Sequence, residues 1–411
     1  MTRLLAARLL LSSWAVLVAA GCGSPPGFSI DRQLAAEAGL DRAAAESVDR
    51  LLTDSFGTPD DPIVPAALAG VIDVERVADA AGPVESHTEG VTTGLYRRHC
   101  SRCHGLTGDG RGAAALYQSP YPRDFRAGAF KFKSTERGAP PTDADLHATL
   151  TRGLAGAAMP SFQLLKEDEL AALVDYTKYL AVRGEVERTL VQELADSDPE
   201  DMEEFADGEA PWVALLVQET IVQVAERWRS AGARVVAADE AENLDSPDLI
   251  ARGKELFHDE KLAGCVKCHG EGGRGSGVQQ ELDLWNGRRR DFLAKNDALA
   301  ASLGTLVDRL ASTPKSSREQ LADRIARARA DLGERRSVGA SLLPPQPTRS
   351  RVLAGGRLRS SGEADDLFRI LHEGIAGSPM PAAGEALTNE QIWSLVAYVQ
   401  SIAMPTGGEQ P

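Results

Sequence analysis

Two pentapeptides of one type, CSRCH at 100–104 and CVKCH at 265–269, contain four of the five cysteines of this 411-residue chain. Two thiols three positions apart on a short helix can each add to one vinyl group of a porphyrin. The histidine that follows is then placed to ligate the porphyrin iron. This is the pattern of covalent c-type haem attachment. It predicts two haem sites, with His104 and His269 as the proximal iron ligands.

Three other uses of paired cysteines fit this sequence less well. Exported proteins often contain disulfides, but a two-residue gap would close a very small, strained ring. A structural zinc site needs four ligands within reach, whereas these two pairs are separated by a whole domain. A thioredoxin-like redox motif needs a βαβ context, and the flanks here are helical or rich in glycine. Haem attachment remains the favoured interpretation.

A second repeated phrase supplies a candidate for the sixth position on each iron. It reads GLAGAAMP at 153–160 and GIAGSPMP at 374–381. Methionine opposite histidine is the axial pair of cytochromes c, and it raises the reduction potential. The glycines allow turns that a Cβ would forbid, so that each loop can approach a porphyrin closely. Met159 and Met380 are therefore predicted as axial ligands. A lone methionine more often packs in a core, but packing would not repeat the whole phrase.

The remaining histidines and methionines have no counterpart in a second copy. We interpret the histidines as surface residues or as residues behind the ligands, and we set aside Met202 in an acidic run and Met404 beyond the last helix. The histidines in this group are His87, His99, His147, His258 and His372.

The two copies share their flanks, which predicts a duplicated helical domain. DLHATLTRG precedes the first methionine phrase and DLFRILHEG the second, and an amphipathic segment follows each, at 167–180 and 389–402. Thr388 and Gln391 form a capping box that starts the second of these helices. A chain of this length suggests two or three domains. We expect a mainly α fold with two small haem domains.

The second copy is longer than the first between its cysteine motif and its methionine. The excess falls at 288–336, where leucines recur at helical spacing on either side of Pro314. This pattern predicts an antiparallel helical hairpin inserted into a surface loop. Its arginines could meet a partner or the acidic run at 193–209, although a solvated insertion without such a role is the simpler expectation.

The first 22 residues are typical of a secretory signal rather than of a folded element. Arg3 and Arg8 precede an apolar run that is too short for a comfortable membrane span. Cys22 follows Ala-Ala-Gly, as in the lipobox of bacterial lipoproteins, although Ala19 replaces the usual leucine. We predict acylation of Cys22, which would tether the protein to a membrane surface. Residues 23–85 are expected to form an N-terminal arm that reaches from this anchor to the first domain.

Residues 184–246 are predicted to join the two haem domains. This segment begins with the acidic run and continues with an amphipathic helix at 210–232, which is expected to pack between the domains. The net charge of −15 disfavours nucleic acid as a partner.

On these motifs, each copy resembles a bacterial class I cytochrome c domain. The whole resembles a tandem di-haem c-type cytochrome and a lipoprotein. The resemblance covers 86–183 and 247–404, and it implies two covalent haem c groups with His/Met axial pairs. It also suggests Arg123 and Arg126 as basic groups near a haem propionate. The implied attachment residues are Cys100, Cys103, Cys265 and Cys268, and the implied axial pairs are His104 with Met159 and His269 with Met380.

These features favour a non-enzymatic carrier of single electrons in a respiratory or other redox chain. Its partners would be redox proteins, and its location the periplasm, anchored to a membrane. A di-haem peroxidase is the alternative, but it needs an open position on one iron, and both copies contain the methionine. The haem subunit of a larger oxidoreductase also remains open. A haem-based sensor would bring an output module, which the sequence does not suggest.

Overall fold

The computed structural model describes residues 27–86, 92–198, 200–201, 204–205, 211–239, 243–275, 277, 282–356 and 358–403. The predicted signal peptide at 1–22 and Cys22 lie outside the described residues, as do His87, Met202 and Met404. The described chain is mainly helical with almost no strand, which confirms the predicted fold class. Its two strands, β1 and β2, have two residues each and pair antiparallel.

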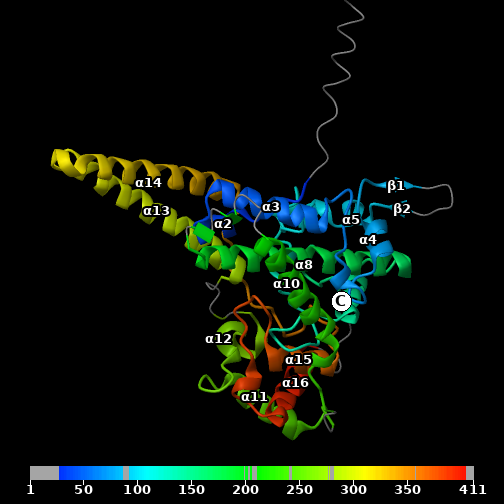
Figure 1. Cartoon of the computed structure of the whole chain (residues 1–411). Helices are drawn as coiled ribbons and strands as arrows, with labels where there is room; N and C mark the ends of the chain where they lie inside the picture. Colours follow the sequence, from blue (N-terminus) through cyan, green and yellow to red (C-terminus); the bar gives the residue numbers. More distant parts are fainter. Residues whose placement is uncertain are drawn as a thin grey trace, which may run out of the picture.

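The larger of two helical bodies is built around α8, a helix of 30 residues at Glu167–Asp196. Residues predicted to share its apolar face, such as Leu173 and Leu180, are buried. Figure 1 shows α3, α4 and α10 around α8 in the upper part of the molecule. The other elements of this body are α2 (Arg32–Ala38), α3 (Arg42–Phe56), η1 (Ala66–Leu68), α4 (Val74–Ala80), β1 (Glu85–Ser86), β2 (Thr92–Thr93), α5 (Leu95–His99), α6 (Ser101–His104), η2 (Ala115–Tyr117), η3 (Phe125–Ala127), α7 (Asp143–Arg152), α10 (Pro211–Arg229) and η4 (Ala231–Arg234).

The smaller body is centred on the crossing of α11 with α16. The predicted capping box begins α16, because Thr388 N–H donates to Gln391 and Gln391 N–H donates back to Thr388 Oγ1. Its predicted apolar residues, among them Ile392 and Val396, are buried. The elements of this body are α11 (Pro247–His258), α12 (Cys265–His269), η5 (Glu271–Gly273), α15 (Ala364–Glu373), η6 (Ala383–Glu385) and α16 (Asn389–Ala403).

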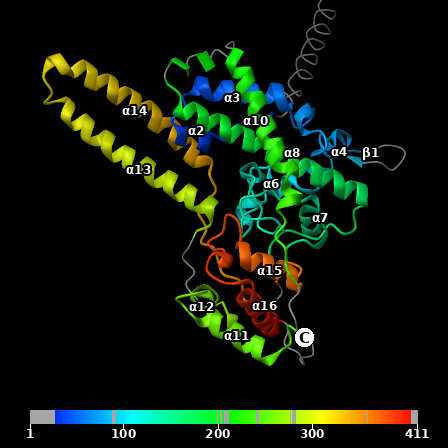
Figure 2. The same cartoon turned by 60° about the horizontal axis from the view of Figure 1, so that its bottom comes forward.

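The predicted hairpin forms, and it is longer than expected. Helices α13 (Leu284–Leu310) and α14 (Lys315–Ser341) run antiparallel and project from the two bodies, as Figures 1 and 2 both show. Its outer part has an apolar cluster of its own around Leu303 and Ile325. Its base is fixed to the N-terminal segment, since Phe292 packs against Ala36 and Arg288 pairs with Asp31. Its arginines therefore meet α2 rather than a described part of the acidic run.

The described part of the N-terminal arm expected at 23–85 packs onto the first body, because Phe28, Leu52 and Phe56 lie in the same core cluster as α8. One expectation about a connecting segment is wrong. Helix α10 does not pack between the bodies. Its apolar face covers α8, and Trp228 donates a hydrogen bond to Glu185. The apolar residues of both segments pack in the core cluster of the first body.

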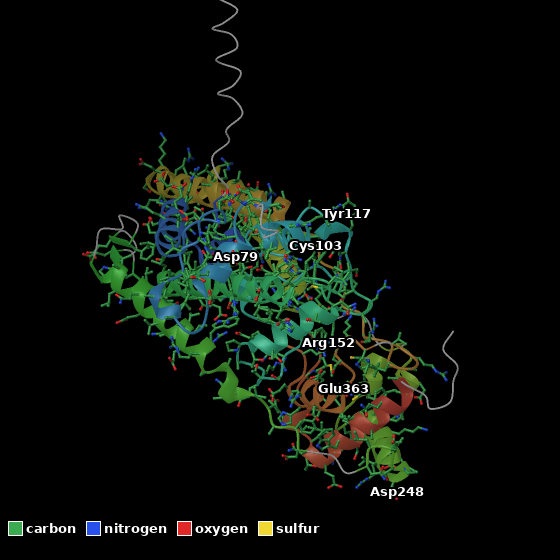
Figure 3. All side chains as sticks on the ribbon, turned by 90° about the vertical axis from the view of Figure 1, so that its right-hand side faces the viewer. Asp79, Cys103, Tyr117, Arg152, Asp248 and Glu363 are labelled. Atoms are coloured by element: carbon green, nitrogen blue, oxygen red, sulfur yellow. The ribbon has the colours of Figure 1, made fainter. Side chains whose placement is uncertain are left out.

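The two bodies contact one another through charged and polar groups. Arg152 of α7 lies 3.5 Å from Asp366 of α15, and Figure 3 shows Arg152 near Glu363 where the bodies meet. The Arg137 N–H donates to Glu373 at 2.6 Å.

Helix α8 continues without a break past residue 183, where the first domain was expected to end. Within the described residues, no helix combines the length and hydropathy needed to cross a bilayer.

Candidate haem site

The first cysteine motif forms the short helix α6 and a tight loop after it. Gly105, Gly108 and Gly110 all have positive φ, which a side chain would strain. Gly110 N–H donates to the His104 carbonyl at 2.8 Å, and the Gly108 carbonyl accepts from Phe125 N–H at 2.8 Å. The glycines that follow the motif in sequence thus fold the chain back under His104.

The ring of His104 is held in one orientation. Its Nδ1 lies 2.9 Å from the carbonyl oxygen of Arg123, and the ring stacks on Phe125 at 4.4 Å between centroids. A carbonyl only accepts, so Nδ1 bears the proton, and Nε2 keeps the lone pair that a metal requires. Burial lowers the pKa of His104 to about 4, so the ring is neutral at neutral pH.

The methionine phrase forms a compact loop after α7. Gly153 and Gly156 have φ of 66° and 67°, and Leu154 N–H donates to the Met159 carbonyl at 3.1 Å. A Cβ on Gly153 would lie 2.6 Å from the Pro160 carbonyl carbon. The loop closes only because this position has no side chain.

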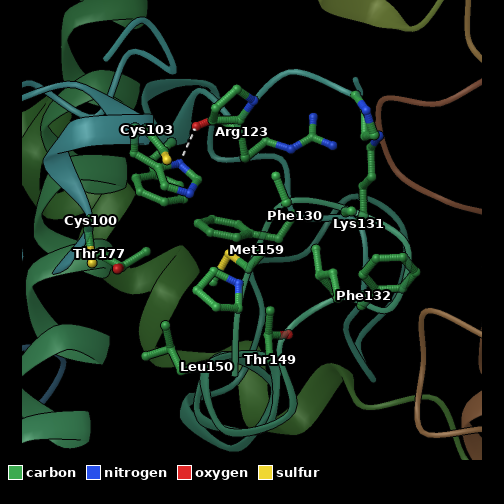
Figure 4. A pocket seen from close by; sticks show the side chains of 18 of the residues that line it. Cys100, Cys103, Arg123, Phe130, Lys131, Phe132, Thr149, Leu150, Met159 and Thr177 are labelled. Carbon is green, nitrogen blue, oxygen red and sulfur yellow. Dashed lines mark hydrogen bonds between the residues drawn. The ribbon is translucent and has the colours of Figure 1, made fainter. Parts of the chain in front are cut away.

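One cavity brings the predicted residues of the first copy together. Cys100, Cys103, His104 and Met159 all line it, and Figure 4 shows both cysteines and the methionine around it. Its other walls are largely apolar and aromatic. They include Phe125, Phe130, Phe132, Leu146, Leu150, Leu154, Pro160 and Phe162.

Neither motif pairs its cysteines in a disulfide, since Cys100, Cys103, Cys265 and Cys268 are all free thiols. Burial, reinforced by Cys103, raises the pKa of the Cys100 thiol to about 12. In the described part of the chain, no group of three or more His, Cys, Asp and Glu residues could hold a metal ion. The zinc alternative therefore gains no support there.

The second copy repeats both local folds. His269 Nδ1 lies 2.9 Å from the Arg351 carbonyl oxygen, which again leaves Nε2 with the lone pair. Gly275 N–H donates to the His269 carbonyl at 2.7 Å, as Gly110 does in the first copy. In the methionine loop, Ile375 N–H donates to the Met380 carbonyl at 3.3 Å.

An aromatic pair joins the helix before each motif to the helix after each methionine. Tyr96 of α5 packs on Tyr176 of α8 with ring centroids 4.8 Å apart. Phe257 of α11 packs on Tyr398 of α16 at 5.3 Å. Tyr96 and Phe257 thus join the helix that leads into each cysteine motif to the helix that follows each methionine loop.

Sequence reasoning missed the carbonyl groups that orient the two histidines. Arg123 O is 19 residues from His104, whereas Arg351 O is 82 residues from His269 because the hairpin intervenes. A shared Arg-x-apolar pattern (Arg123-Asp-Phe and Arg351-Val-Leu) could have shown their equivalence. The suggested role of Arg126 was wrong, because its guanidinium pairs with Asp124 at 2.8 Å and with Asp31 at 3.8 Å.

Four of the remaining histidines are described, and none has a second-copy equivalent at a cavity. His147 and His258 contact Glu167 and Glu271, each at 3.0 Å. His372 lies 2.8 Å from Glu373. His99 lines the cavity of the first copy from the edge of Phe162. These positions agree with roles on the surface or behind the ligands.

The comparison with known families agrees with this geometry. Residues 92–176 match the family model described as cytochrome C oxidase, cbb3-type, subunit III. This match supports the presence of a c-type cytochrome domain, which binds haem c. The matched residues include Cys100, Cys103, His104 and Met159. The match also supports a role for this chain as a haem protein in electron transfer.

Whole-chain comparisons add less. No curated protein is detectably similar in sequence. Among solved structures, a chain of the reducing HAO-like protein complex of Kuenenia stuttgartiensis is 21% identical, with a TM-score of 0.46. The alignment covers 78% of this chain and 98% of that chain.

The residues of the first cavity fit a covalently attached haem. The two thiols, an imidazole with Nε2 unprotonated and a thioether border one apolar space. These are the donor types that c-type attachment and His/Met ligation require.

Proposed function

We propose that this protein is a di-haem c-type cytochrome that transfers single electrons between redox partner proteins. Each haem would be attached through one Cys-x-x-Cys pair and ligated by one histidine and one methionine. Acylated Cys22 would hold the protein at a membrane surface in the periplasm. Haem iron supplies the one-electron couple, and the protein supplies the attachment, the ligands and the surroundings.

The observation that carries the proposal is the cavity shared by Cys100, Cys103, His104 and Met159. Burial keeps His104 neutral, the Arg123 carbonyl holds its ring in one orientation, and the glycine loop presents Met159. Aromatic walls exclude water, which favours the less charged, reduced state of an iron centre.

The second haem is supported by the equivalence of the two copies. His269 is held by the Arg351 carbonyl in the same way, and the loop of Met380 has the same closing hydrogen bond. A methionine on each iron leaves no open position for peroxide, so electron transfer is favoured over peroxidase activity.

The experiment measures haem content and ligation in the full chain. The mature protein should carry the mass of two haems, and its oxidised spectrum should show the weak methionine-to-iron band at long wavelength. Met159→Ala and Met380→Ala should each remove part of that band, whereas the control Met202→Ala should leave it unchanged. A mass that shows one haem or none, or hydrogen peroxide turnover far above that of free haem, would refute the proposal.

The anchor is tested separately from the haem sites. Cys22→Ser should move the protein from the membrane fraction to the soluble periplasmic fraction without changing its absorption spectrum. Retention of the variant in the membrane fraction would exclude acylation of Cys22 as the anchor.

A further inference from the structure

Three cations line the cavity of the first copy, and one of them belongs to the second body. They are Arg123, Lys131 and Arg359. Among the described residues that line this cavity, none is an aspartate or a glutamate. Arg359 follows the hairpin in sequence. Its Nη2 donates a hydrogen bond to the Gly156 carbonyl, in the loop of Met159, at 3.3 Å.

These positive charges are only weakly compensated by the protein. Asp283 lies 4.0 Å from Lys131, at the limit of an ion pair. Burial, reinforced by Arg123, lowers the pKa of Lys131 to about 8, with Asp283 acting against the shift and Arg359 adding to it. Burial also lowers the pKa of Arg123 to about 10 and, together with Arg351, lowers the pKa of Arg359. A partly buried group of cations of this kind favours an anionic ligand.

We propose that Arg359 completes, together with Arg123 and Lys131, a carboxylate-binding site that spans both bodies and holds the propionate groups of the haem in the first domain. The inference rests on the proposed function, since it requires a haem in this cavity. Its consequence is that a residue of the second domain sets the potential of the first haem. The Gly156 contact fixes Arg359 in place, because it ties the guanidinium to the same loop that presents Met159.

The test compares the midpoint potentials of Arg359→Gln, Arg359→Lys and Arg252→Gln in the full holoprotein. Arg252 is an exposed arginine on α11 that pairs with Glu390, so its replacement removes the same charge from the same domain. The potential assigned to the first haem is the component that Met159→Ala alters in a spectroelectrochemical titration.

Removal of a positive charge near the haem stabilises the oxidised iron, so Arg359→Gln should lower this potential. At a fixed solution potential, the ratio of reduced to oxidised first haem should fall by about tenfold, the order expected for one unit charge near a partly buried centre. Arg359→Lys should restore most of the ratio, and Arg252→Gln should not change it. The melting temperature of each variant is also measured. It reports destabilisation caused by loss of the Gly156 contact, whereas the midpoint potential reports loss of the charge.

Two results would overturn the inference. One is an unchanged first potential in Arg359→Gln, with both haems still attached. The other is a first potential in the wild type that shifts with added phosphate at constant ionic strength, which would assign the cations to a free anion. A protein without attached haem would instead refute the proposed function itself.

Discussion

The crossing of α11 and α16 makes a sharp prediction about Gly253. A Cβ at this position would lie 1.9 Å from the Ser394 carbonyl oxygen and 2.8 Å from Tyr398 Cβ. Ordinary contacts begin at 3.4 Å, so Gly253→Ala must push the two helices apart by about 1.5 Å. The closest atom is a backbone oxygen of α16, which cannot move away by a change of rotamer.

The sign of the effect follows from two opposing contributions. Alanine in place of glycine inside a helix stabilises it by up to ~1 kcal/mol. Overpacking of a tight contact costs ~1–3 kcal/mol, and separation of the helices would also loosen Phe257 from Tyr398. We expect a net loss of about 2 kcal/mol, which corresponds to a fall in melting temperature of roughly 4–8 °C for a domain of ~150–250 residues.

Thermal unfolding followed by circular dichroism provides the assay, and the hairpin provides matched controls. Gly304 in α13 and Gly333 in α14 are also helical, but nothing lies within 4 Å of a Cβ at either position. Their replacement by alanine should not lower the melting temperature. If Gly253→Ala melts at or above the wild-type temperature, the close crossing described here is incorrect.

Two further predictions concern the N-terminal segment and the hairpin. Asp31→Asn removes a carboxylate 3.3 Å from Arg288 and 3.8 Å from Arg126, and should lower the free energy of unfolding at pH 7 by about 3 kcal/mol. Burial alone would raise the pKa of Asp31, but the nearby arginines hold it well below its usual range, so the wild type has this stabilisation above about pH 4 and loses it in acid. Urea unfolding should therefore show a smaller difference between variant and wild type at pH 3 than at pH 7, and equal differences would contradict the argument. Replacement of 299–332 by a short turn removes the separate apolar cluster of the hairpin, and should leave haem content and both midpoint potentials unchanged in redox titrations.

The local folds around the proposed haem ligands could be predicted from sequence because they depend on short-range constraints. Glycines at Gly153 and Gly374 are needed where φ is positive and the chain passes close to the following proline. The capping box at Thr388 acts within a single turn. Repetition of such phrases therefore carried reliable information about both copies.

The packing of the first body could not be predicted from short sequence motifs. Arg183, Glu185 and Glu187 of α8 are charged, yet all three are buried. Arg183 pairs with Glu187 at 3.1 Å, and Glu187 accepts from Asp31 N–H. Apart from that i,i+4 pair, their partners Asp31, Asp49 and Arg227 are distant in sequence. The charged stretch of α8 therefore gave no sign that the helix continued through the core.

The contact between the two bodies gives the second glycine of each methionine phrase an additional role. A Cβ on Gly156 would lie 2.2 Å from Arg351, and one on Gly377 would lie 2.3 Å from Trp285. Arg123 in turn stacks over Trp285 at 3.6 Å. The loop of Met159 thus packs against Arg351, whose carbonyl holds His269. The loop of Met380 packs against Trp285, which Arg123, the residue whose carbonyl holds His104, covers. Any separation of the two bodies would loosen both methionine loops together, so the two proposed iron sites cannot be perturbed independently through this contact.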